Sequence, residues 1–218
     1  MQNKILIYSA GDYAREVCWS IEEMHKNSDL EVKFIDDSSE ATTVAGWEVI
    51  RYDEALTKYN DWQMVNAIGN PRTRNQKISQ SRADGFAHTT VIHPSAALGP
   101  RIEIGEGCII QANASLTCDI VLGVGVSINL NCTVGHDVRI GDCVSMSPLT
   151  AISGRVEIED YVRIGTGVSI INGTREKPLR IGKGAFIAAG ATVTKDIPED
   201  VLVAGTPARV IKNLSKSK

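Results

Sequence analysis

Large apolar residues recur at every sixth position through the middle of this chain. The positions are Ile92, Leu98, Ile104, Ile110, Leu116, Leu122, Ile128, Val134, Ile140, Met146, Ile152, Ile158, Ile164 and Ile170. A smaller or β-branched residue, such as Val126 or Cys132, lies two positions before most of them, so each unit reads as a short strand with two inward side chains and a turn. Because six residues turn an α-helix by about 600°, a helix would scatter these side chains around its axis. The pattern predicts a stacked β-solenoid.

The stride breaks once, at residues 172–178, and resumes at Ile181, Ile187 and Val193. The interruption is polar and contains Gly and Pro, so it is expected to loop out while the coils on both sides keep stacking. The closing segment 203–211 is expected to cap the open end of the stack.

The first part of the chain has a different pattern, in which buried-type strands alternate with helical segments. Expected strands are residues 4–8, 32–35, 46–49 and 64–68, and expected helices are residues 13–25, 52–59 and 73–85. A strand, a turn, a helix and a second strand predict a small Rossmann-like α/β domain. We place this domain at residues 1–88 and the solenoid at residues 89–218.

Composition narrows the class of function. The 218 residues include 43% hydrophobic ones, as in ordinary globular proteins, and the net charge of −3 without a basic block argues against nucleic acid or a membrane surface as partner. No signal peptide and no membrane-spanning apolar run is apparent. Five cysteines without close pairs fit a reducing cytoplasm better than a disulfide framework. We therefore expect a cytoplasmic protein that acts on a small molecule.

Both parts of the chain resemble known acyltransferases. The six-residue stride resembles the left-handed β-helix of hexapeptide-repeat acyltransferases, in which three hexads close one coil and residues eighteen apart stack. Residues 7–11, 35–37, 67–71 and 92–96 resemble motifs of one branch of that family, which acetylates nucleotide-linked amino-sugars or the hydroxyls of sialic acid. The resemblance implies an N-terminal Rossmann-like α/β domain followed by an all-β left-handed parallel β-helix.

The same resemblance implies where the chemistry lies. The family's Asn-x₆-His-Asp/Glu arrangement matches Asn129, His136 and Asp137, with the histidine as general base and the carboxylate as its partner. The implied donor is acetyl-CoA, bound between two solenoids of a homotrimer. Positions matching the donor site are Ser145, Gly154, Thr166 and Ala189. Several members carry a second histidine where this chain has Ser145, whose hydroxyl keeps a hydrogen-bonding group there.

The acceptor is expected to bind the first domain, where the resemblance points to Gly11, Asp36 and Gly69. The alternative interpretation of Asp36 is a polar residue that caps a strand end. A complete dinucleotide fingerprint is absent. Asp12 lies in the turn where a helix N-terminus would attract a diphosphate, and a carboxylate aimed there would oppose binding. Either Asp12 points away, or the acceptor is not a standard nucleotide-sugar.

The resemblance favours an acetyltransferase that acts on the amine of a nucleotide-linked amino-deoxysugar in surface glycan synthesis. O-acetylation of sialic acid or a related sugar is the alternative, which Asp12 makes more plausible. A non-catalytic solenoid subunit would be marked by loss of the Asn-His-Asp set, which is intact. A metal-dependent hydrolase on the same repeat would need three imidazoles, and only His93 and His136 lie in the repeat, so no metal is expected.

Overall fold

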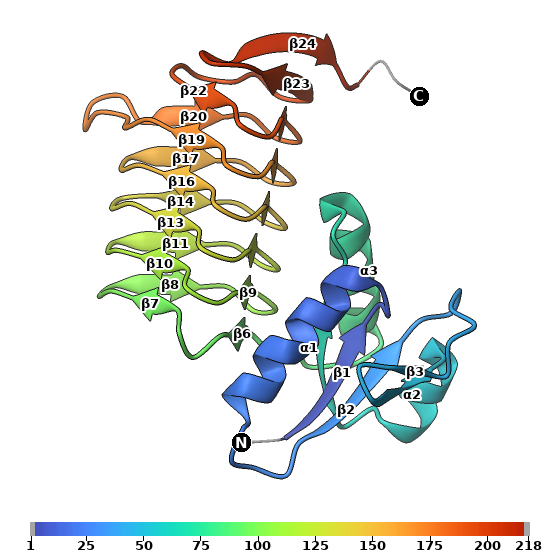
Figure 1. The fold of residues 1–218 in the computed structure, drawn as a ribbon. Coiled ribbons are helices and arrows are strands. Elements are labelled where there is room, and N and C mark those ends of the chain that lie inside the picture. Colours follow the sequence, from blue (N-terminus) through green and yellow to red (C-terminus); the bar gives the residue numbers. More distant parts are fainter. Residues whose placement is uncertain (1–2, 216–218) are drawn as a thin grey trace.

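The computed structural model describes residues 3–215, which form a tall β-helix with an α/β domain packed against the side of its lower end (Figure 1). The strands of the α/β domain are β1 (Lys4–Tyr8), β2 (Glu31–Ile35), β3 (Thr43–Val44), β4 (Trp47–Ile50) and β5 (Gln63–Asn66). Its helices are α1 (Asp12–Met24), α2 (Tyr52–Lys58) and α3 (Pro71–Ala83). The sheet has the order β3-β4-β2-β1-β5, with β3 antiparallel to β4 and the other neighbours parallel.

Alternation along β1 explains why this sheet is covered on both faces. Ile5 and Ile7 point to the side packed by α1, whereas Leu6 and Tyr8 point to the side packed by α2. Helix α3 begins where Asn70 accepts hydrogen bonds from two amides of the first turn, each at 3.1 Å, and Pro71 follows where no amide donor is needed. The predicted Rossmann-like arrangement is confirmed.

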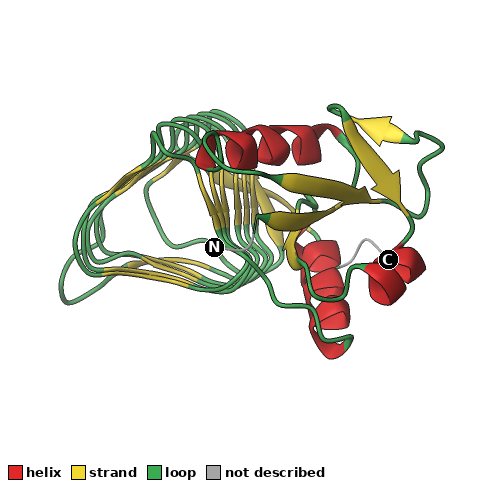
Figure 2. Cartoon of the chain, turned by 90° about the horizontal axis from the view of Figure 1, so that it is seen from below, coloured by secondary structure: helices red, strands yellow, loops and turns green. Residues whose placement is uncertain are grey.

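Three parallel sheets form the faces of a triangular prism (Figure 2). The β6 face consists of β6 (Val91–Ile92), β9 (Ile109–Ile110), β12 (Ser127–Ile128), β15 (Ser145–Met146), β18 (Arg163–Ile164), β21 (Phe186–Ile187) and β23 (Val201–Ala204), closed by the antiparallel β24 (Arg209–Asn213). The β7 face consists of β7 (Ala97–Leu98), β10 (Ser115–Leu116), β13 (Thr133–Val134), β16 (Ala151–Ile152), β19 (Ser169–Ile170) and β22 (Thr192–Val193). The β8 face consists of β8 (Ile102–Ile104), β11 (Ile120–Leu122), β14 (Arg139–Ile140), β17 (Val156–Ile158) and β20 (Leu179–Ile181).

The chain turns three corners in each coil. The first corner leads from the β6 face to the β7 face, the second from the β7 face to the β8 face, and the third back to the β6 face. Residues eighteen apart pair across successive coils, as Val134 does with Ile152. The interruption at residues 172–178 leaves the prism as a loop at the second corner, and the stacking continues above it from β19 to β22. The predicted left-handed β-helix is confirmed.

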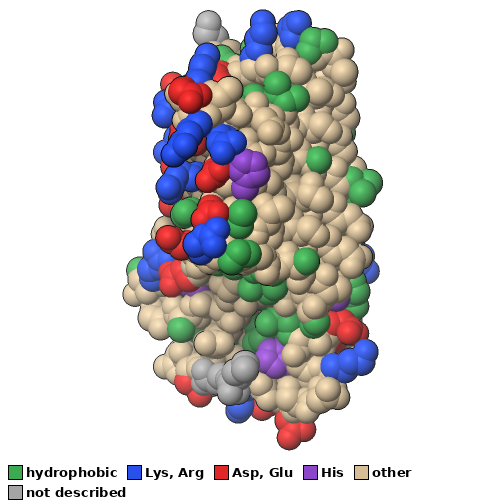
Figure 3. Space-filling view, turned by 90° about the vertical axis from the view of Figure 1, so that its left-hand side faces the viewer, with side chains coloured by type: hydrophobic (Ala, Val, Ile, Leu, Met, Phe, Trp, Pro, Cys, Tyr) green, Lys and Arg blue, Asp and Glu red, His purple; other side chains and the backbone are tan. Residues whose placement is uncertain are grey.

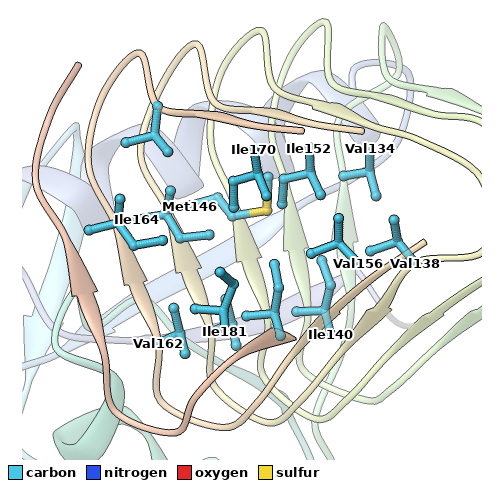
Figure 4. Packing of buried hydrophobic residues seen from close by; sticks show 14 of the residues in the cluster. Val134, Val138, Ile140, Met146, Ile152, Val156, Val162, Ile164, Ile170 and Ile181 are labelled. Atoms are coloured by element: carbon cyan, nitrogen blue, oxygen red, sulfur yellow. The ribbon is translucent and has the colours of Figure 1, made fainter. Parts of the chain in front are cut away.

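The six-residue stride fills the interior of the prism. Side chains from the three faces, among them Val134, Ile140 and Met146, meet along its axis (Figure 4). Leu98 in the lowest coil is an exception, with 37% of its surface exposed, because no coil lies beneath it. Successive coils support one another through this continuous core.

A buried arginine joins the two parts of the chain. Arg74 of α3 has no exposed surface, and its guanidinium donates to the carbonyl oxygens of Gly125 (2.9 Å) and Cys143 (2.8 Å) in the β-helix and of Ile68 (2.6 Å) in its own domain. Burial lowers the pKa of this group. Gly125, at a φ of +62°, permits the close approach of α3, because a β-carbon there would lie 2.6 Å from the side chain of Ile78. The interface is therefore tightly fitted.

Residues 3–215 can be examined for membrane-spanning helices, disulfides and metal-binding clusters. Within that range, no helix is long and apolar enough to cross a membrane. The five cysteines are all free thiols, and four of them are buried. The described residues hold no cluster of three or more His, Cys, Asp or Glu side chains that could bind a metal ion.

Candidate active site

The side chains of His136 and Asp137 form a hydrogen-bonded pair at the second corner, just after β13. His136 Nδ1 lies 2.8 Å from Asp137 Oδ2, and somewhat less than half of each side-chain surface is exposed. A carboxylate can only accept a hydrogen bond, so the neutral imidazole carries its proton on Nδ1 and leaves the lone pair of Nε2 free. This tautomer suits a general base.

The imidazole of His136 rests on Gly154 of the next coil. A β-carbon at position 154 would lie 2.6 Å from Nε2 and 2.7 Å from Cε1, so any other residue would displace the ring. Gly154 was predicted as a donor-binding position. Its position beside His136 gives the glycine a steric role as well.

Arg155 also contacts this pair, and the sequence interpretation missed it. Its Nη2 lies 3.4 Å from Asp137 Oδ2, the oxygen that accepts from the imidazole. The eighteen-residue stacking distance could have identified it, because 155 lies one coil above 137. Arg155 and Asp137 also line a groove on the outer side of the corner, together with Arg139, Glu157, Thr174, Arg175 and Pro178.

The other predicted residues divide between two places. Asn129, Thr166 and Ala189 lie at the first corner, on the opposite edge of the β7 face from His136. Thr166 and Ala189 are in adjacent coils, where the amide of Gly190 donates to the carbonyl of Thr166 at 2.9 Å. Within one chain, the structure therefore brings Gly154 to the His136–Asp137 pair and leaves the first-corner residues apart from it.

Ser145 lies on the β6 face and points at the α/β domain. Its hydroxyl accepts from Arg74 at 3.0 Å and donates to the carbonyl of Gly69 at 3.3 Å. Gly69, predicted to contact the acceptor, thus contacts the β-helix through its backbone. The stride identifies Ser145 as an outward residue but contains no information about which face the first domain covers.

A second pocket lies at the carboxyl ends of the central strands of the α/β domain, where open α/β sheets bind ligands. It is lined by Tyr8, Ser9, Ile35, Asp36, Asp37, Ser38, Ile68 and Lys77. Asp36 Oδ1 accepts from Ser38 and Ser39, and Oδ2 accepts from Ala10 at 3.1 Å. Burial raises the pKa of Asp36, but these hydrogen bonds outweigh it and the net pKa is lowered. The Asp36 carboxylate therefore lines the pocket and holds the loop after β2 and the backbone of Ala10 in place.

Gly11 and Asp12 lie at the turn that leads from β1 into α1. Gly11 precedes α1, and its amide donates to Ser9 Oγ at 3.2 Å. The carboxylate of Asp12 is 94% exposed and forms an ion pair with Arg15 at 2.6 Å. Asp12 is not among the residues that line the pocket, and Arg15 offsets its charge, so the expected conflict with a diphosphate is weakened.

Known proteins are similar to this chain both in its first domain and over nearly its full length. Residues 4–81 match the PglD N-terminal domain family. WeeI from Acinetobacter baumannii is 36% identical over 95% of this chain and 99% of its own, with a TM-score of 0.91. The acetyltransferase domain of PglB from Neisseria gonorrhoeae, in complex with acetyl coenzyme A, is 30% identical over 97% of this chain and all of its own, with a TM-score of 0.88. This chain belongs to the PglD-type family of hexapeptide-repeat acetyltransferases.

Other members of this wider group differ in what they acetylate. PerB from Caulobacter crescentus, solved with CoA and GDP-perosamine, is 27% identical over 96% of this chain and 97% of its own, with a TM-score of 0.85. A tetrahydropyridine-dicarboxylate N-acetyltransferase from Staphylococcus aureus is 52% identical over 61 residues. Those residues are 28% of this chain and about a quarter (23%) of that enzyme. As a member of the PglD-type family, the chain is an acetyl-CoA-dependent acetyltransferase.

Proposed function

We propose that this enzyme transfers an acetyl group from acetyl-CoA to the amine of a nucleotide-linked amino-deoxysugar. The observation that carries the proposal is the His136–Asp137 pair with a free Nε2, on a chain that aligns over nearly its full length with nucleotide-sugar N-acetyltransferases. The α/β domain binds the acceptor and the β-helix binds the donor. Because CoA thioesters and reduced thiols are found in the cytoplasm, we place the reaction there.

In the proposed reaction, Nε2 of His136 takes a proton from the amine as its nitrogen attacks the thioester carbonyl. The carbon–nitrogen bond forms, the carbon–sulfur bond breaks, and the proton leaves with the coenzyme A thiol. Asp137 stabilises the imidazolium that forms in between. Asp12, which had favoured O-acetylation of a sialic acid, pairs with Arg15 and does not line the pocket, so it gives that alternative little support.

The acceptor is tested by thiol release from acetyl-CoA with UDP-, dTDP- and GDP-linked 4-amino-6-deoxysugars. The matched control is the same nucleotide-sugar with a hydroxyl in place of the amine. We expect thiol release and the mass gain of one acetyl group with at least one amino-sugar and neither with its hydroxyl counterpart. Turnover of free sialic acid without turnover of any amino-sugar would contradict the proposal.

We further propose that the active enzyme is a homotrimer. The outward side chains of the β7 face are small and uncharged: Ala97, Ser115, Thr133, Ala151, Ser169 and Thr192. Charged side chains instead gather along the neighbouring side of the prism (Figure 3). Exposed apolar residues border the uncharged face, with Leu149 at the first corner 59% exposed and Ile171 at the second 42% exposed. These features favour burial of this face between subunits.

A ring of three chains would unite the two halves of the predicted site. In a heterologous interface, the second corner of one chain, with His136, meets the first corner of the next, with Thr166 and Ala189. Sedimentation equilibrium at micromolar concentration should give about three times the chain mass of 23.5 kDa. A stable monomer or dimer that retains full activity would rule the trimer out.

A further inference from the structure

Four charged residues form a column at the second corner of the β-helix. Arg101, Asp119, Asp137 and Arg155 lie eighteen residues apart, each with a left-handed φ of 56° or 57°. Arg101 holds Asp119 by two bonds of 2.6 and 2.8 Å. Arg155 approaches Asp137 from the coil above at 3.4 Å. Each of the two neighbouring carboxylates is thus paired with an arginine one coil away.

The two pairs differ in one respect that matters for chemistry. Asp137 Oδ2 is shared, because it accepts from His136 Nδ1 at 2.8 Å while lying beside Arg155. A negative carboxylate favours the protonated imidazole, and a nearby guanidinium opposes that effect. Arg155 therefore offsets part of the negative charge with which Asp137 favours the protonated ring.

Other charged groups lie on the coil below the pair and along the groove that Asp137 and Arg155 line. The coil below contributes Asp119, which pairs with Arg101, and the thiol of Cys118, whose pKa is raised by its hydrogen bond to Asp119. The β8 face contributes Arg139 and Glu157, and Glu157 is held by Arg180 at 3.0 Å. The loop at residues 172–178 contributes Arg175. Among the described residues 3–215, Arg155 is the cation that forms an ion pair with Asp137, the carboxylate that accepts from His136.

We propose that Arg155 is a positioning residue that lowers the proton affinity of His136 through the shared oxygen of Asp137. The inference rests on His136 being the general base. By keeping the imidazole neutral toward mildly acidic pH, Arg155 widens the range in which the base is ready to accept a proton. The arginine itself touches neither substrate nor donor in this role.

The test is the substitution Arg155→Gln, which keeps a polar side chain and removes the charge. The titration midpoint of the His136 ring is measured by NMR, with its signals among the four histidines assigned from a His136→Gln sample. We expect the midpoint to rise by roughly half to one pH unit, because the cation paired with the Asp137 carboxylate has been removed. The acid limb of kcat/KM should rise with it, while the rate at high pH stays within about twofold of the original.

Two further variants sharpen this test. Arg155→Lys retains the charge and should restore the midpoint. Arg82→Gln removes the same charge from an ion pair with Glu106, away from the second corner, and should leave the midpoint unchanged. A midpoint that stays or falls in Arg155→Gln would overturn the inference. The NMR measurement is independent of turnover, so it separates this failure from a failure of His136 as base, which would appear as undiminished activity in His136→Ala.

Discussion

Replacing His136 with alanine is expected to lower kcat by roughly 10²- to 10⁴-fold, the usual contribution of one positioned general base. The affinity for acetyl-CoA should change little, because the imidazole acts on the acceptor's proton. The side chain is close to half exposed and lies at a corner, so its removal leaves the hydrophobic interior intact. Steady-state kinetics with acetyl-CoA and the preferred acceptor, together with a thermal melt, check both points.

Two companion variants separate loss of the base from loss of its position. Asp137→Asn should cost less activity than His136→Ala, because an amide oxygen can still accept from Nδ1 and hold the ring, while the negative charge that would stabilise the imidazolium is lost. Gly154→Ala should reproduce part of the loss, since its methyl group would occupy space now filled by the ring. Near-normal turnover in His136→Ala at neutral pH would mean that the amine attacks without this base.

Replacing Arg74 with methionine is expected to lower the free energy of unfolding by about 3 kcal/mol, because buried carbonyl oxygens lose a charged donor. Gly125, Cys143 and Ile68 supply those oxygens from both sides of the domain interface. Methionine keeps much of the volume, so the effect of the polar contacts is isolated from that of a cavity. Urea unfolding, followed by tryptophan fluorescence, measures the change.

Arg82→Met is the matched control on the same helix. Arg82 is 52% exposed and pairs with Glu106 at the surface, so its loss should change stability by less than about 1 kcal/mol. Equal effects of the two substitutions would contradict the role assigned to Arg74. The three tryptophans lie in the α/β domain, so the fluorescence signal reports the unfolding of that domain.

Most of the fold could be predicted from the periodicity of hydrophobic residues in the sequence. A six-residue stride fixes which side chains face inward, and positions such as Val134 and Ile152 occupy the interior as predicted. The expected α/β strands and helices agree with the structure to within about two residues. The two-residue strand β3 was missed, because Thr43–Val44 is too short to show alternation.

The arrangement around the site was less accessible from the sequence. Arg74 reads as a surface residue on a polar helix, and only the β-helix packed against α3 makes it buried. Ser145 is outward by the stride, yet which domain covers it depends on long-range packing. His136 and Asp137 were found through their motif. Their catalytic role, the donor positions and the roles of the two domains stay predictions.

The constant spacing between coils sets the height of the His136–Asp137 pair relative to the α/β domain. Tyr13, at the start of α1, is hydrogen-bonded to Ser127 in the strand that precedes β13, so the ligand-binding edge of the α/β domain and His136 stand at nearly the same height. Each added coil of eighteen residues between the two would raise the dyad by about 4.8 Å, whereas a shorter insertion can loop out at a corner, as residues 172–178 do, and leave the height of the coils unchanged. The height of the dyad above the docked α/β domain thus changes in steps of one coil, and an acceptor that reaches from one to the other would have to match one of these discrete spacings.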